Sequence, residues 1–143
     1  MAVKSGGRTV RSNAAHLRAP GSAYTLLGRA HTVLAQAAVA ETADERFSLA
    51  HLAALRTVAA LIADRGRPAA ATKRLMSAWV LSDTVAPEYG EWAAYFAAGA
   101  ASRAAIEAGA LTVVGERDAD DQLRAAQDFL ALVEASFGML AAG

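Results

Sequence analysis

Residues 42–66 read TADERFSLAHLAALRTVAALIADRG, and this stretch decides the fold class of the chain. Thr42 and Glu45 have the spacing of a capping box, which starts a helix. Arg65 and Gly66 place a cation in the last turn and a helix-ending glycine directly after it. Between these ends, one side of the helix carries residues at helical spacing, namely Phe47, His51, Leu55, Val58 and Ile62. The stretch therefore predicts a long core helix between Thr42 and Gly66.

Similar patterns on both sides of this stretch predict further helices over about 22–40, 73–84 and 87–108, and from 116 onward. The one β-branched patch is too short and too isolated to form a sheet. Only two or three residues around Glu41 link the first two helices, so these must pack as an antiparallel hairpin. The sequence thus predicts an all-α, antiparallel up-and-down bundle of four core helices plus one short helix.

Length and composition narrow the classes of protein. A chain of 143 residues and 14.7 kDa forms one domain with a single hydrophobic core. The absence of cysteine excludes disulfides, thiolate catalysis, zinc fingers and iron–sulfur clusters. No charge-free apolar run approaches the roughly 20 residues that a bilayer requires, and no apolar secretory segment follows the basic N-terminus. We therefore expect a cytoplasmic protein that does not enter a membrane.

Residues 1–21 differ from the rest of the chain in charge. They lack acidic residues and contain four basic ones, Lys4, Arg8, Arg11 and Arg18. The whole chain balances 14 basic against 14 acidic residues, which excludes a globally basic nucleic-acid-binding protein. Because the stretch also carries two adjacent glycines and a Pro-Gly breaker, we predict a disordered, solvated basic tail over 1–21 and a single bundle domain over 22–143.

Two histidines lie on the apolar sides of the first two helices. His31 and His51 are each ten residues from the turn at Glu41, so an antiparallel hairpin places them at the same height, where they can face each other. Opposed imidazoles can share a proton, bind a ligand or ligate a metal. A third metal ligand is missing, so we favour two partly buried, hydrogen-bonded histidines and expect no metal. No motif for a phosphate, dinucleotide or zinc cofactor occurs either, and we expect no cofactor.

Arg46 and His51 form an Arg-x4-His pattern at the start of the second helix. Such a pair suits metal-independent RNA cleavage, in which the imidazole exchanges a proton with the 2′-hydroxyl or the leaving oxygen and the guanidinium stabilises the phosphorane. Five helical residues separate the two side chains by about 140° around the axis. The two side chains can therefore meet only if the long side chain of Arg46 reaches around the helix or if the site forms across a dimer interface. In this hypothesis His31 assists the pair. The alternative is a chance pattern.

A basic loop follows the second helix. Its cations are Arg65, Arg67, Lys73 and Arg74. Four cations at a helix–helix junction can bind the phosphates of a nucleic acid. The alternative is an ordinary solvated connection in which Arg65 also caps the preceding helix. No aromatic residue is interleaved, so stacking on single-stranded bases is not supported.

Aromatic residues concentrate between positions 79 and 96. Trp92, Phe96 and Arg103 share one face of the predicted helix over 87–108. Large rings must fill the core of an alanine-rich bundle, so core packing is our preferred interpretation of this face. A dimer interface is the second interpretation, because tryptophan and arginine are enriched in interface hot spots.

The chain resembles the HEPN domains, in particular a small all-helical branch found in high-GC bacteria. The resemblance is carried by Glu45-Arg-Phe-Ser-Leu-Ala-His-Leu-Ala-Ala-Leu-Arg56, by Ser77-Ala-Trp79 with Val85-Ala-Pro87-Glu-Tyr-Gly-Glu-Trp92, and by Asp120-Asp-Gln-Leu-Arg124 with Phe129-Leu. It covers about residues 22–138. HEPN domains are small antiparallel helical bundles that usually dimerise, and many are metal-independent ribonucleases of toxin or defence systems.

The family's catalytic motif is Arg-x4–6-His near the start of a late helix, commonly with a polar residue after the arginine. This chain departs from it, because its only Arg-x4-His lies on the second helix with Phe47 after Arg46, and its late helices contain no histidine. The resemblance therefore implies the fold and weakens the catalytic claim.

Three hypotheses about function follow. The first is a non-enzymatic HEPN-like homodimer that acts as an interaction module or binds RNA or a nucleotide. The second is a metal-independent endoribonuclease that uses Arg46 and His51. The third is a scaffold subunit that binds a protein partner.

Overall fold

A computed structural model describes residues 3–67 and 77–138, with side chains described from Gly21 onward. These residues form six α-helices and one short 3-10 helix and contain no strand, which confirms the predicted all-α class. The elements are α1 (Val3–Ala38), α2 (Ala43–Arg65), α3 (Ala78–Val85), η2 (Pro87–Tyr89), α4 (Gly90–Ala98), α5 (Ala100–Glu107) and α6 (Glu116–Ser136).

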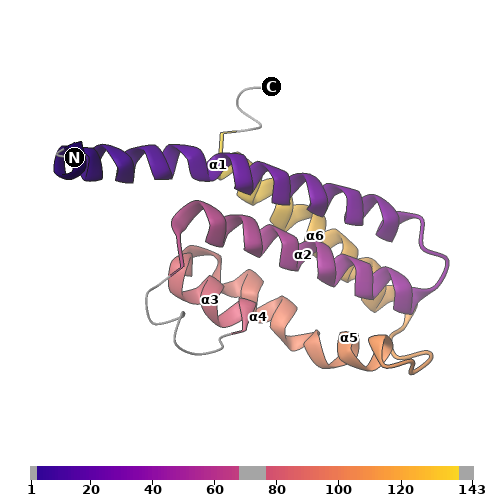
Figure 1. The fold of residues 1–143 in the computed structure, drawn as a ribbon. Coiled ribbons are helices and arrows are strands. Elements are labelled where there is room, and N and C mark those ends of the chain that lie inside the picture. Colours follow the sequence, from indigo (N-terminus) through magenta and orange to yellow (C-terminus); the bar gives the residue numbers. More distant parts are fainter. Residues whose placement is uncertain (1–2, 68–76, 139–143) are drawn as a thin grey trace.

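Helix α2 is the centre of the bundle (Figure 1). It packs against α1, α6, α3 and α5, and α6 also packs against α1. The chain direction alternates between α1, α2, the α3–α5 run and α6, as in an up-and-down bundle (Figure 1). By length and composition α2 could cross a membrane, but 56% of its most apolar window is buried inside the bundle, as in the core helix of a soluble protein.

Both ends of α2 are formed by the residues that the sequence indicated. The Thr42 side chain accepts a hydrogen bond from the Glu45 backbone N–H at 3.1 Å, which caps the first turn. At the other end Gly66 has a φ of 90° and its N–H donates to the Ile62 carbonyl at 2.8 Å. A side chain at Gly66 would be strained in this left-handed conformation.

The predicted fourth helix over 87–108 is wrong as a single helix. The chain there forms η2, α4 and α5, with the break between α4 and α5 at Gly99. A Cβ atom at Gly99 would lie 3.0 Å from Cζ of Phe47, so the ring of a residue on α2 packs directly on the Gly99 backbone. Glycine also has a weak helix propensity, and the two effects together place the break at this residue.

Helix α1 begins at Val3, whereas the sequence placed the start of the first helix near Ser22. Side chains before Gly21 are outside the described residues. The separate basic tail over 1–21 and the single domain over 22–143 stay predictions.

Candidate interaction face

Arg46 is held by three acceptors at the junction of the α1–α2 turn and α6. Its Nη1 donates to Glu116 Oε1 at 2.8 Å and to Asp120 Oδ1 at 3.2 Å, and its Nη2 donates to the Ala40 carbonyl at 3.3 Å. Only 15% of the Arg46 side chain is exposed. The guanidinium therefore ties the beginning of α6 to the α1–α2 turn, with its charge opposed by two carboxylates.

His51 is a buried, neutral core residue with 2% of its surface exposed. Its Nε2 lies 3.1 Å from the Phe96 carbonyl oxygen, and because a carbonyl only accepts, Nε2 carries the proton and donates it. The ring also packs edge-on against Trp79, with centroids 5.5 Å apart. Burial lowers the His51 pKa, and nearby Arg103 lowers it further, against an opposing effect of the Phe96 carbonyl.

The three residues that the sequence named as a catalytic group each have different partners. Arg46 binds α6, His51 contacts α3 and α4, and His31 Nε2 lies 2.6 Å from Glu134 Oε2 on α6. The expectation that His31 and His51 face each other is therefore wrong. Both histidines are ten residues from the turn, but their helices also pack against other helices of the bundle. The imidazole of His31 therefore contacts α6, whereas that of His51 contacts α3 and α4.

The two described cations of the basic loop, Arg65 and Arg67, have different surroundings. Arg65 forms an ion pair with Glu88 at 2.6 Å and donates to the Val85 carbonyl at 3.1 Å. Arg67 is exposed and lines an apolar hollow of about 610 Å³ beside α2 and α3. Lys73 and Arg74 lie outside the described residues, so their proposed contact with phosphates stays a prediction.

Trp92, Phe96 and Arg103, the predicted interface set, differ in their surroundings. Phe96 is fully buried, which agrees with the preferred core-packing interpretation and excludes Phe96 from the interface that was the second interpretation. Trp92 is half-buried and stacks on Phe129 with ring centroids 5.7 Å apart. The Nε of partly exposed Arg103 is buried without a hydrogen-bond partner among the described residues. Among these three residues, Arg103 is therefore the one with a hydrogen-bond donor still available to a ligand or partner.

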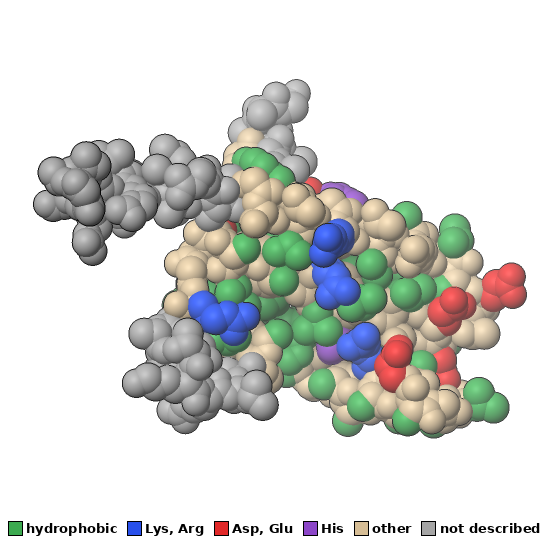
Figure 2. Space-filling model, in the orientation of Figure 1, with side chains coloured by type: hydrophobic (Ala, Val, Ile, Leu, Met, Phe, Trp, Pro, Cys, Tyr) green, Lys and Arg blue, Asp and Glu red, His purple; other side chains and the backbone are tan. Residues whose placement is uncertain are grey.

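The sequence analysis placed Leu55 and Ile62 on the apolar side of α2 but did not recognise that they belong to an apolar stripe that the bundle leaves partly exposed. This stripe consists of five half-buried residues, Leu49, Leu52, Leu55, Ala59 and Ile62, and is called the α2 stripe below. Figure 2 shows this face of the molecule, with basic side chains beside and between apolar surface. The sequence contained a signal for this stripe, because apolar residues occur on most sides of α2 and only one side had been assigned to the core.

Three arginines from the helices around the stripe have no ion pair or hydrogen bond within the described part of the chain. They are Arg29 on α1, Arg56 on α2 and Arg103 on α5. Arginine beside half-exposed leucine is typical of a protein interface, where apolar surface is buried at the centre and guanidinium groups pair across the border.

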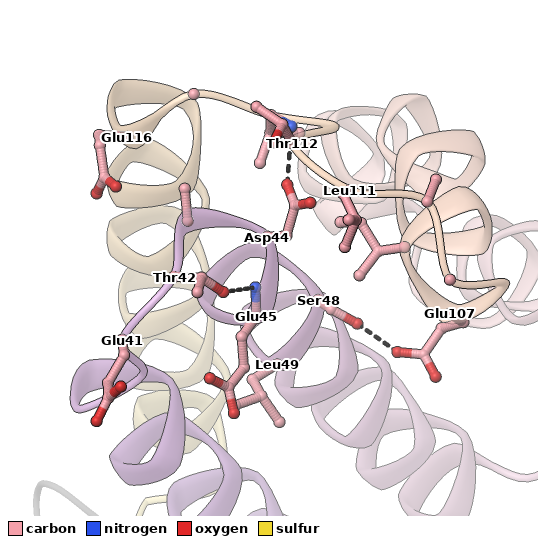
Figure 3. Close-up of a pocket in the computed structure, with 16 residues that line it drawn as sticks. Glu41, Thr42, Asp44, Glu45, Ser48, Leu49, Glu107, Leu111, Thr112 and Glu116 are labelled. Atoms are coloured by element: carbon pink, nitrogen blue, oxygen red, sulfur yellow. Dashed lines mark hydrogen bonds between the residues drawn. The ribbon is translucent and has the colours of Figure 1, made fainter.

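The N-terminal end of α2 borders a hollow of about 810 Å³, closed on its other side by the α5–α6 loop (Figure 3). Asp44 holds this loop, because its carboxylate accepts from the N–H groups of Val113 and Val114 at 2.9–3.0 Å. These donors lower the Asp44 pKa. Ser48 donates to Glu107 at 2.6 Å on the same wall. The lining, called the acidic hollow below, contains five carboxylates and no Lys or Arg.

The described residues contain no group of three or more side chains that could together hold a metal ion. A protein-family model described as HEPN_SAV_6107-like HEPN matches residues 37–134, which extend from the end of α1 into the last turns of α6. Comparisons with curated proteins and with solved structures found no match.

Proposed function

The chain belongs to the HEPN family, and from this we propose that it is a non-catalytic HEPN domain that acts as a homodimeric interaction module. The observation that carries the proposal is the structural use of both Arg46 and His51. The guanidinium is neutralised by Glu116 and Asp120, and the single imidazole proton is donated to a backbone carbonyl.

RNA cleavage by such a pair requires an imidazole that can exchange a proton with a ribose hydroxyl in the same cleft as a free guanidinium. His51 has 2% of its surface exposed, and a proton added at Nδ1 would put charge into an aromatic core. Arg46 would have to give up three hydrogen bonds to reach a phosphate. These contacts favour the non-enzymatic hypothesis over the ribonuclease.

The α2 stripe is the surface that we assign to self-association. The acidic hollow adjoins its N-terminal end at Leu49, and Arg67 lies near its C-terminal end. A two-fold axis normal to the stripe pairs two α2 helices antiparallel, so that the acidic hollow of one copy meets Arg67 of the other. Unlike charges then meet at both ends of one self-complementary interface, with the leucines at its centre.

The dimer is tested by replacing Leu52 with glutamate. A carboxylate at the centre of a desolvated apolar contact should weaken the dimer at least about thirtyfold. Sedimentation velocity at tens of micromolar should show a dimer for the wild type and a monomer for Leu52→Glu. Leu132→Glu is the matched control, because Leu132 is 46% exposed on α6, and this variant should remain dimeric. A monomeric wild type, or a Leu52→Glu variant that dimerises normally, would contradict the proposal.

The absence of catalysis is tested with mixed single-stranded RNA in EDTA. Wild type and a folded His51→Ala variant should both leave the RNA intact, because the His51 imidazole is buried away from a 2′-hydroxyl in the wild type and absent from the variant. Metal-independent cleavage by the wild type that disappears in His51→Ala would instead place the chemistry at Arg46 and His51 and overturn the non-catalytic assignment.

A further inference from the structure

We propose that the basic N-terminal segment of one copy, residues 1–20, docks into the acidic hollow of a second copy. The inference rests on the proposed dimer and adds a second contact to it. Residues 1–36 lie outside the family match, so the contact would be an addition of this chain to the matched domain.

The hollow and its surroundings expose apolar groups next to unpaired carboxylates. Leu111 on the α5–α6 loop is 87% exposed, and Val39 at the α1–α2 turn is 78% exposed. Val39 shares a neighbouring hollow with Glu41 and Glu45, which also line the acidic hollow. These two glutamates form no ion pair within the described residues, unlike Glu116, which binds Arg46. The site thus presents free negative charge beside apolar surface.

The N-terminal segment has the complementary pattern in its sequence. Its apolar residues Val3, Val10 and Leu17 recur every seven residues. Lys4, Arg11 and Arg18 follow them directly at the same spacing, and the segment contains no acid. The backbone of α1 is helical from Val3, and in a helix this spacing places an apolar row beside a basic row. Such a helix matches an apolar surface bordered by carboxylates.

The contact must form between copies. Helix α1 runs from Val3 to Ala38 without interruption, and at 1.5 Å per residue it is about 54 Å long. Its N-terminal part extends past the end of the bundle opposite the α1–α2 turn (Figure 1). A segment at that end cannot reach Glu41 of its own chain. In the antiparallel dimer, however, the N-terminal part of the partner's α1 points toward the end that carries the acidic hollow.

A charge-exchange experiment tests this contact in the full-length chain. One variant carries Lys4→Glu, Arg8→Glu, Arg11→Glu and Arg18→Glu, a second carries Glu41→Lys and Glu45→Lys, and a third combines all six. The dimer dissociation constant is measured by sedimentation equilibrium at about 50 mM and about 500 mM salt, because screening weakens exposed charge pairs.

We expect each single-sided variant to weaken the dimer about tenfold at the lower salt concentration, and the combined variant to recover most of this loss. At the higher concentration the differences should shrink. The matched control, Glu91→Lys with Asp128→Lys, reverses two carboxylates that line a hollow near Trp92, and it should dimerise as the wild type does.

Two outcomes would overturn the inference. One is an unchanged dissociation constant in either single-sided variant, and the other is a combined variant no tighter than the weaker parent. If Leu52→Glu still disrupts the dimer in those cases, the proposed dimer stands and only the docking of the segment fails. A monomeric wild type would overturn both.

Discussion

Replacing Phe96 with alanine should lower the free energy of unfolding by about 4 kcal/mol, a large part of the stability of a small domain. Phe96 is 0% exposed, and its ring lies 5.7 Å from Phe129, 5.7 Å from Trp79 and 5.2 Å from Tyr95 between centroids. The rest of the core is rich in alanine, whose short side chains cannot move into the space that the ring leaves. Urea unfolding followed by circular dichroism measures the loss.

Two further variants make the Phe96 experiment specific. Phe96→Leu keeps most of the buried volume and should cost only about 1–1.5 kcal/mol. Tyr95→Ala removes the neighbouring ring, which is 44% exposed, and should cost about 1 kcal/mol. If Phe96→Ala instead retained its stability and lost self-association, the interface interpretation of the sequence would be right and the core assignment wrong.

The parts of the fold that the sequence predicted correctly depend on local contacts. Thr42 caps α2 through a residue three positions away, and Gly66 ends it through a hydrogen bond to Ile62. Interactions of this range can be recognised from spacing alone. The break at Gly99 depends on Phe47 of another helix, so a helical pattern over 87–108 gave no indication of it.

The candidate site was predicted less well, because its contacts also join residues that are far apart in the sequence. The Arg-x4-His pattern named Arg46 and His51 as candidate catalytic residues, but it gave no indication of their partners Glu116 and Phe96, which are far away in the sequence. A spacing rule describes one helix and does not say which neighbour a side chain meets. The sequence analysis assigned Leu55 and Ile62 to the apolar side but did not recognise the α2 stripe as partly exposed, because a helix that is apolar on most sides does not reveal which side its neighbours leave open.

The second large effect is expected for His51→Ala, which should lower the free energy of unfolding by about 3 kcal/mol near neutral pH. The substitution removes the contact with Trp79 and leaves the Phe96 carbonyl without its donor in the core. If His51 were instead a free site residue, its replacement would hardly change stability. The exposed His31→Ala is the comparison, and it should cost less than about 1 kcal/mol.

The effect of His51→Ala should also depend on pH, with a sign fixed by the direction of its pKa shift. Burial holds the His51 pKa below the 6.5 of a free histidine, so below about pH 6.5 the unfolded chain takes up a proton that the folded chain does not. The wild type therefore loses stability as the pH falls through this window, and the alanine variant lacks this loss. The difference in unfolding free energy between the two proteins should be full above about pH 6.5 and shrink toward about pH 5, as measured by urea unfolding at several pH values. A difference that stays constant or grows on acidification would mean that His51 is charged in the folded protein, and it would reopen the assignment of the Arg46–His51 pair as a site for proton transfer.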